Sequence, residues 1–262
     1  MTVLHVNHIS KSFKSTITKS RYDVLKDVSL KLKEKTCLAL VGESGSGKSS
    51  LAKIIVGLEK ADEGEIYYEG ISFKQIKRSI RKEIRQNIQI VFQDPLSSFN
   101  PRLTMRQSMS EPISNKLTLS KYERNTLIEH LIEEVGLDRE ILTKYPHELS
   151  GGQLQRINIA RAVAAKPRVI VLDEVVSSLD AINQLKILDL LIYFKDTYHL
   201  SYLFISHDIQ AVRYIADEIA VMDKGRIVEE VSNTDAINRL SHPASIRLLS
   251  SILTVPSHVK SK

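Results

Sequence analysis

A glycine-rich run between an apolar segment and a helical pattern constrains the fold of this chain most. The run Gly42-Glu43-Ser44-Gly45-Ser46-Gly47-Lys48-Ser49 fits the pattern G-x-x-x-x-G-K-[ST]. A nearly continuous apolar stretch, residues 36–41, precedes the run, and apolar residues at helical spacing follow over residues 49–58. Strand, loop and helix N-terminus in this order let backbone N–H groups converge on phosphate oxygens. The sequence therefore predicts a phosphate-binding loop in an α/β fold.

The residue types in this loop indicate a nucleotide with Mg²⁺. Lys48 can neutralise the β- and γ-phosphates, and the Ser49 hydroxyl can hold Mg²⁺. A glycine- and serine-rich turn without a ligand is the alternative, but the flanking strand and helix favour the phosphate site. The predicted nucleotide contacts in this region are Gly42, Glu43, Ser44, Gly45, Ser46, Gly47, Lys48, Ser49 and Ser50.

A pair of carboxylates follows a second apolar run, residues 169–172. ATP hydrolysis at a phosphate loop needs a carboxylate near Mg²⁺ and a group that orients the attacking water. Asp173 ends the run and is predicted to serve Mg²⁺, while Glu174 is predicted to polarise the water. Alone, an acidic pair at a strand end would indicate a helix cap. Together with the loop at 42–49, it favours the catalytic interpretation.

Strand and helix patterns alternate along the chain, which predicts a mostly parallel α/β core. The predicted strands are 3–9, 24–32, 36–41, 65–68, 88–92, 169–172, 202–205, 219–222 and 227–231. The predicted helices are 49–58, 105–113, 121–135, 154–165, 184–198 and 209–215. Residues 1–253 are expected to form one ATP-binding domain, with residues 94–150 as a helical insertion and 254–262 as a disordered tail.

The run Leu149-Ser150-Gly151-Gly152-Gln153 stands at the head of a predicted helix. Small residues, exposed N–H groups and a hydroxyl at a helix N-terminus form a second anion site. A plain N-cap by Ser150 is the simpler interpretation, and both can hold together. This run resembles the signature of the ATP-binding-cassette (ABC) ATPases. The resemblance implies a P-loop NTPase core with an N-terminal antiparallel β part and a helical subdomain.

Further residues match the pattern of this family. Gln93 resembles the Q-loop glutamine, which senses Mg²⁺ and faces the membrane partner, and His207 resembles the histidine that contacts the γ-phosphate. Residues 178–180 resemble the D-loop. Phe13 resembles the aromatic that stacks on adenine, and Tyr22 is its rival. In the family, one subunit's loop and another subunit's signature hold the same ATP, so Ser150, Gly151, Gly152 and Gln153 are expected to bind nucleotide across a dimer.

The resemblance also indicates a branch of the family. Residues 91–102 read VFQDPLSSFNPR, and residues 241–250 carry a His-Pro pair followed by two leucines. Both resemble the oligopeptide, dipeptide and nickel importers. This implies a second ATP-binding subunit (a heterodimer or a homodimer), two transmembrane permease subunits, and an extracytoplasmic binding protein. The cargo is expected to be a peptide, nickel or a metal–metallophore complex. His242 has no partner at ligand spacing, so a structural role is expected.

The composition agrees with a chain at the cytoplasmic face of a membrane. No apolar stretch is long enough to cross a bilayer, and no signal-peptide core opens the chain. Cys37 is expected to be a buried, inert thiol. The net charge is +6, and the basic run at residues 74–85 is interpreted as a solvated helix face, with lipid head groups as the alternative. That run has no interleaved aromatics, and no nucleic-acid partner is expected.

Three other functions stay open at this point. A non-transport ABC protein acting in translation or DNA maintenance usually needs two cassettes or a long insertion, and this chain has room for neither. A nucleotide-binding regulatory subunit would fit if Val175-Val176, where the family often has Pro-Thr, marked a degenerate site. Neither valine carries the chemistry, so activity is expected to survive. An ABC exporter often has its membrane domain fused to the cassette.

Overall fold

The structure is a computed structural model that describes residues 1–14, 20–77, 84–177, 179–233, 237 and 239–250. Three sequence predictions fall wholly or partly outside these residues. They are the tail at 254–262, Ser178 of the expected D-loop, and the middle of the basic run at 74–85.

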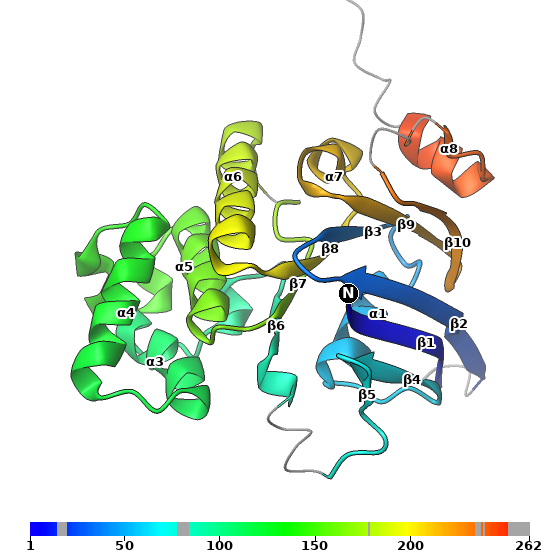
Figure 1. Ribbon diagram of the computed structural model, residues 1–262. Helices are drawn as coiled ribbons and strands as arrows, with labels where there is room; N and C mark the ends of the chain where they lie inside the picture. Colours follow the sequence, from blue (N-terminus) through cyan, green and yellow to red (C-terminus); the bar gives the residue numbers. More distant parts are fainter. Residues whose placement is uncertain (15–19, 78–83, 178, 234–236, 238, 251–262) are drawn as a thin grey trace, which may run out of the picture.

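A six-stranded sheet forms the centre of the molecule, in the order β10-β9-β3-β8-β7-β6 (Figure 1). Its strands are β3 (Cys37–Val41), β6 (Ile88–Val91), β7 (Val169–Asp173), β8 (Ser201–Ser206), β9 (Glu218–Asp223) and β10 (Arg226–Val231). All neighbours pair in parallel except β10, which runs antiparallel to β9. The predicted mostly parallel sheet is confirmed. The carboxyl ends of β3, β8, β7 and β6 therefore meet at one edge.

Strand β3 is buried along its whole length, as its continuous apolar run predicts. Cys37, Ala39 and Val41 face the side of the sheet covered by α5 (Gly151–Ala164), α6 (Ala181–Tyr198) and α7 (Ile209–Ile215). Leu38 and Leu40 face α1 (Lys48–Val56) and the second sheet. Cys37 is fully buried, as predicted, and burial raises the pKa of its thiol.

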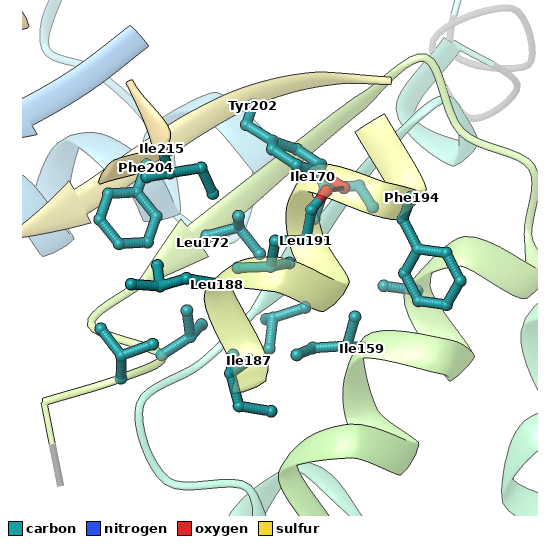
Figure 2. Close-up of a cluster of buried hydrophobic side chains, with 14 of the residues drawn as sticks. Ile159, Ile170, Leu172, Ile187, Leu188, Leu191, Phe194, Tyr202, Phe204 and Ile215 are labelled. Carbon is teal, nitrogen blue, oxygen red and sulfur yellow. Dashed lines mark hydrogen bonds between the residues drawn. The ribbon is translucent and has the colours of Figure 1, made fainter. Parts of the chain in front are cut away.

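The larger core lies between the sheet and helices α5 and α6 (Figure 2). Tyr202 and Phe204 of β8 point toward α6, where Leu188, Leu191 and Phe194 meet them. The Tyr202 hydroxyl donates a 3.0 Å hydrogen bond to the Leu191 carbonyl, which removes the cost of burying it. Each large apolar side chain buried here contributes about 1.5–3 kcal/mol. This packing fixes the position of β7 and β8, which carry the acidic pair and His207.

A four-stranded antiparallel sheet, in the order β2-β1-β4-β5, packs beside α1. Its strands are β1 (Thr2–Lys14), β2 (Arg21–Lys33), β4 (Glu63–Tyr68) and β5 (Ile71–Ser72). The expected antiparallel part is thus present, but β1 and β2 extend beyond the predicted ranges. Bulges are the reason: the β1–β2 register shifts repeatedly, and His8 and Asp27 adopt φ values of 54° and 57°. Such bulges interrupt the alternation on which the prediction depended.

The helices α3 (Met105–Lys116) and α4 (Lys121–Glu134) lie between β6 and β7 in the chain, beside α5 (Figure 1). Short 3₁₀ turns at Leu96–Ser98, Arg139–Thr143 and Pro146–Glu148 connect this region. Capping boxes begin α3 and α4, with Thr104 and Gln107 on the first and Ser120 and Glu123 on the second. The largely buried Glu134 carboxylate of α4 accepts hydrogen bonds from Tyr193 (2.8 Å) and Tyr198 (2.6 Å) of α6.

The helix α8 (Pro243–Ser250) is an element that the sequence patterns did not predict. It lies against β9 at the outer side of the sheet (Figure 1). His242 stands just before it, and its Nδ1 accepts a 3.2 Å hydrogen bond from the Ala244 amide. The expected structural role of His242 is therefore confirmed. Among the described residues, no helix is long and apolar enough to span a membrane, and no cluster of three His, Cys, Asp or Glu could hold a metal.

Candidate functional site

The loop at 42–49 connects the carboxyl end of β3 to α1, as predicted. Gly42 packs so closely on the β9 backbone that a Cβ there would lie 2.2 Å from the Met222 carbonyl oxygen. Gly47 caps α1 with φ 110°, a conformation that L side chains rarely adopt. The Gly225 amide of the β9–β10 turn donates a 3.0 Å hydrogen bond to the Ser46 carbonyl. Glycine is therefore required at positions 42 and 47, and contacts with the β9–β10 hairpin hold the loop in its conformation.

Lys48 is buried at the first turn of α1. Its Nζ donates hydrogen bonds to the carbonyls of Gly42 (2.7 Å) and Glu43 (3.0 Å), inside the curve of the loop. Burial lowers the pKa of Lys48, while the nearby Glu174 and Asp173 carboxylates act in the opposite direction. A partly desolvated cation held by the loop is the arrangement that phosphate binding requires.

Ser49 lies in the first turn of α1 and Asp173 ends β7, and the two side chains meet in the structure. The Ser49 hydroxyl donates a 3.1 Å hydrogen bond to Asp173 Oδ1, although the two residues lie 124 positions apart. Burial raises the pKa of Asp173, and the bond from Ser49 opposes this shift. A hydroxyl and a carboxylate are hard oxygen donors, which suit Mg²⁺ bound by few protein ligands together with nucleotide phosphates. The donor set at this point therefore fits Mg²⁺.

Glu174 and His207 form a second contact at the same edge. His207 Nδ1 lies 3.3 Å from Glu174 Oε2, and the Glu174 side chain is 18% exposed while that of His207 is 54% exposed. Glu174 has φ 52°, the left-handed region that costs a non-glycine residue about 1 kcal/mol or more. Its amide is held by a 3.0 Å hydrogen bond to the Ile205 carbonyl. Strain retained at a carboxylate beside the phosphate loop is typical of a catalytic position.

Gln93 is linked to Glu174 by Ser177, a residue that the sequence patterns did not single out. Gln93 Nε2 donates a 3.2 Å hydrogen bond to Ser177 Oγ, and Ser177 Oγ donates a 2.9 Å bond to the Glu174 carbonyl. Ser177 thereby connects the turn after β6 to the backbone of Glu174. The serine belongs to the segment after the acidic pair, but no local pattern indicates a partner 84 positions away. Val175 and Val176, the departure from the family pattern, are buried in the core.

The residues at 149–153 begin α5 as expected. Ser150 Oγ accepts a hydrogen bond from the Gln153 amide, and Gln153 Oε1 accepts one from the Ser150 amide. The simple capping interpretation of Ser150 therefore holds. In the described part of the chain, no hydrogen bond or ion pair joins this segment to the loop at 42–49. Gly151 is exposed and Gly152 half-buried, so the helix end presents backbone to its surroundings.

Phe13 and Tyr22, the two aromatics considered for adenine, are paired neighbours on β1 and β2. Their ring centroids lie 6.2 Å apart, and Lys11 Nζ lies 5.3 Å from the centre of the Phe13 ring. Phe13 is half-buried, whereas Tyr22 is 53% exposed. Both rings belong to the same aromatic patch, so the structure leaves the choice between them open. Ser50 lies half-buried in the first turn of α1.

The family model described as "ABC transporter" matches residues 25–177, from strand β2 to the serine after the acidic pair. The chain belongs to the ABC transporter family. This ABC chain has the family's ATPase core, and the predicted fold class is confirmed by solved cassettes. It resembles the dimeric cassette MJ0796 in a post-hydrolysis state bound to ADP and Pi, with TM-score 0.79, 29% identity, and coverage of 87% of this chain and 98% of that one. The prediction of an ATP-hydrolysing enzyme is confirmed at the level of the family.

Relatives of this ABC chain agree with the predicted branch. It is 41% identical to the oligopeptide transport ATP-binding protein AppF of Bacillus subtilis, over 86% of this chain and 69% of the relative. It is 40% identical to the nickel import ATP-binding protein NikE of Shigella boydii, over 87% of each chain. A cassette of the cbiONQ complex, cbiO1 of Clostridium perfringens, shares the fold with TM-score 0.77 and 24% identity, covering 97% of this chain and 96% of that one.

Proposed function

We propose that this chain is the ATP-hydrolysing subunit of an ABC importer. The observation that carries the proposal is the meeting of four separate segments at one sheet edge. The phosphate loop, Asp173 with Glu174, His207 and Gln93 all stand at the carboxyl ends of neighbouring parallel strands. Under this proposal residues 1–253 act as one ATP-binding domain, with residues 94–150 as its helical subdomain.

Each group at this edge has a part in hydrolysis. Lys48 and the loop amides hold the β- and γ-phosphates, and Phe13 or Tyr22 stacks on adenine. Mg²⁺ would be held by Ser49, Asp173 and Gln93, and it would offset phosphate charge. Glu174 orients the attacking water, and His207 contacts the γ-phosphate from its position 3.3 Å from Glu174. The hydrogen bonds from Gln93 to Ser177 and from Ser177 to the Glu174 carbonyl connect the membrane-facing turn to the backbone of the catalytic residue.

The signature segment at 149–153 would act on the ATP of a second subunit. The support is the open helix end, together with the likeness to a cassette that is described as a dimer. The partner is an ATP-binding subunit of a different kind or a second copy of this chain. Two permease subunits would bind the helical region near Gln93 and keep the chain at the cytoplasmic face of the membrane, while an extracytoplasmic binding protein would deliver the cargo. No nucleic acid takes part.

The relatives suggest the class of cargo. Their names describe transport of oligopeptides and import of nickel, so we propose a peptide, nickel or a metal–metallophore complex as the transported substrate. Specificity would reside in the binding protein and the permeases, since the site described above recognises only nucleotide.

Two measurements test the proposal. Purification of the tagged chain from detergent-solubilised membranes is expected to bring along two permeases and an ATP-binding subunit, whose identity also names the branch. Lys48→Ala in this complex is expected to lose MgATP affinity by at least about tenfold, because it removes the buried cation of the loop. Unchanged ATP binding in Lys48→Ala, or co-purification with nucleic acid in place of permeases, would contradict the proposal.

A further inference from the structure

The phosphate loop carries a negative charge of its own, at Glu43. This side chain is 53% exposed and stands directly after Gly42. A carboxylate in a loop that binds a polyanion repels its ligand, because like charges at short range are unfavourable even in partly exposed sites. The sequence pattern permits any residue at this position, so the pattern alone does not account for the carboxylate.

The neutralising partner comes from the unpredicted helix α8. Arg247 Nε donates a 2.8 Å hydrogen bond to Glu43 Oε1, across 204 positions of sequence. Arg247 Nη2 also lies 3.9 Å from Asp223 Oδ1, at the end of β9. The hydrogen bond and charge of Arg247 hold the pKa of Glu43 below its usual range, with a smaller effect from Lys224. The carboxylate is therefore ionised and directed toward α8.

Hydrogen bonds to β10 attach α8 to the sheet and set the position of Arg247. The Glu229 carboxylate of β10 accepts hydrogen bonds from the amides of Ser241 (2.8 Å) and His242 (3.1 Å) at the start of α8. It also accepts a 2.6 Å bond from the Ser245 hydroxyl. The Leu248 side chain is buried in the same cluster as Val221 of β9. These bonds fix the helix axis, and with it the position of Arg247 one turn further on.

The hairpin that carries α8 also supports the phosphate loop. Gly42 packs on the Met222 carbonyl, and the Gly225 amide binds the Ser46 carbonyl at 3.0 Å. Hairpin, helix and loop thus form one connected unit in which Arg247 is the cation that faces Glu43.

We propose that Arg247 is a positioning residue for ATP, which acts by binding the Glu43 carboxylate and neutralising it. This inference rests on the proposed role of the loop at 42–49. Arg247 offsets the repulsion between the Glu43 carboxylate and the triphosphate, and it holds that carboxylate on the α8 side of the loop. The residue acts through Glu43 and takes no part in the chemical step, so it governs the KM for ATP more than kcat.

A double-mutant cycle that removes each charge in turn, in the purified transporter complex, tests this. Arg247→Ala is expected to raise the KM for ATP about threefold and to change kcat less. The variant leaves the Glu43 charge uncompensated, and one such charge near the phosphates has about this effect at physiological salt. Glu43→Gln is expected to lower the KM, since it leaves Arg247 unopposed. The double variant is expected to return near the wild-type KM, and Arg247→Lys to keep it. Arg213→Ala on α7, an exposed arginine outside this unit, is the control and keeps the wild-type KM.

Salt dependence separates a charge effect from a structural one. The ratio of KM values between Arg247→Ala and wild type is expected to fall toward one as salt rises from about 50 mM to about 500 mM. A raised KM that persists in the double variant would overturn the proposal, as would a weakened affinity in Glu43→Gln alone. If Arg247→Ala unfolds, the KM for ATP of Glu43→Gln still tests the proposal, because it is expected to fall below the wild-type value. A wild-type complex without ATPase activity, or Lys48→Ala with normal affinity, would refute the proposed function instead.

Discussion

Gly152→Ala separates the signature's role in folding from its role in function. Gly152 is the second residue of α5, and its φ is not positive. Among the described residues, no heavy atom lies within 4 Å of a Cβ built at Gly151 or Gly152. A methyl group therefore fits, and alanine in a helix is favoured over glycine by up to about 1 kcal/mol. For a chain of this size, that corresponds to a rise in Tm of about 2–4 °C.

The same methyl group is expected to lower ATP turnover about a hundredfold. If the helix end at 149–153 meets the nucleotide of a second subunit, a methyl group on it displaces the phosphates by about 1 Å. Misplacement of this size costs about a hundredfold in rate. The assay is steady-state ATPase activity of the purified transporter complex, with thermal unfolding of the same sample.

Gly70→Ala provides the matched control. It adds a methyl group at an exposed turn between β4 and β5, where φ is +79° and, within the described residues, no atom lies within 4 Å. That variant is expected to lose about 1 kcal/mol of stability because alanine is strained there, and to keep its turnover. Wild-type turnover in a Gly152→Ala complex of normal stability would refute the assignment of the signature to nucleotide binding.

Three further changes test the site and its support. Gly42→Ala places a Cβ 2.2 Å from the Met222 carbonyl oxygen, so we expect a loss of about 3 kcal/mol in chemical denaturation together with weaker MgATP binding; wild-type stability would show that the loop is not pinned on β9. Asp173→Asn removes a buried charge whose pKa is raised by burial, so it should raise Tm at pH 7 while abolishing Mg²⁺-dependent turnover. Because the folded pKa lies above the unfolded one, wild type gains stability as pH falls toward the ordinary aspartate range near pH 4, and the Asn variant should lack that gain in a pH series of melts. Glu134→Ala leaves the Tyr193 and Tyr198 hydroxyls without their acceptor, and should cost about 1–3 kcal/mol by urea denaturation; an unchanged midpoint would mean that α4 and α6 are held by apolar packing alone.

The parts of the fold that local patterns determine were predictable. The β3–loop–α1 unit follows its prediction within a residue or two, because a buried parallel strand needs a continuous apolar run and glycine must occupy the turn. The β9–β10 hairpin around Lys224 and Gly225 follows for a similar reason, since both residues adopt positive φ.

The parts that depend on distant contacts were not predictable. Helix α8 is short, and its anchor is a glutamate on β10 with its hydrogen bonds to Ser241, His242 and Ser245. The Ser177 hydroxyl accepts a hydrogen bond from Gln93, which lies 84 positions away in the sequence. The signature segment is the opposite case: its sequence indicates a phosphate-binding helix end, but under the proposed function the residues that complete it would come from another subunit.

Substitution of Glu174 tests the central claim most directly. Glu174→Gln keeps the shape of the side chain beside His207 and removes the carboxylate that would orient water. ATP binding and ATP turnover should be measured on the same purified transporter complex. We expect MgATP affinity within about twofold of wild type and a fall in kcat of at least about a hundredfold. A Glu174→Gln complex that hydrolyses ATP at the wild-type rate would contradict the account.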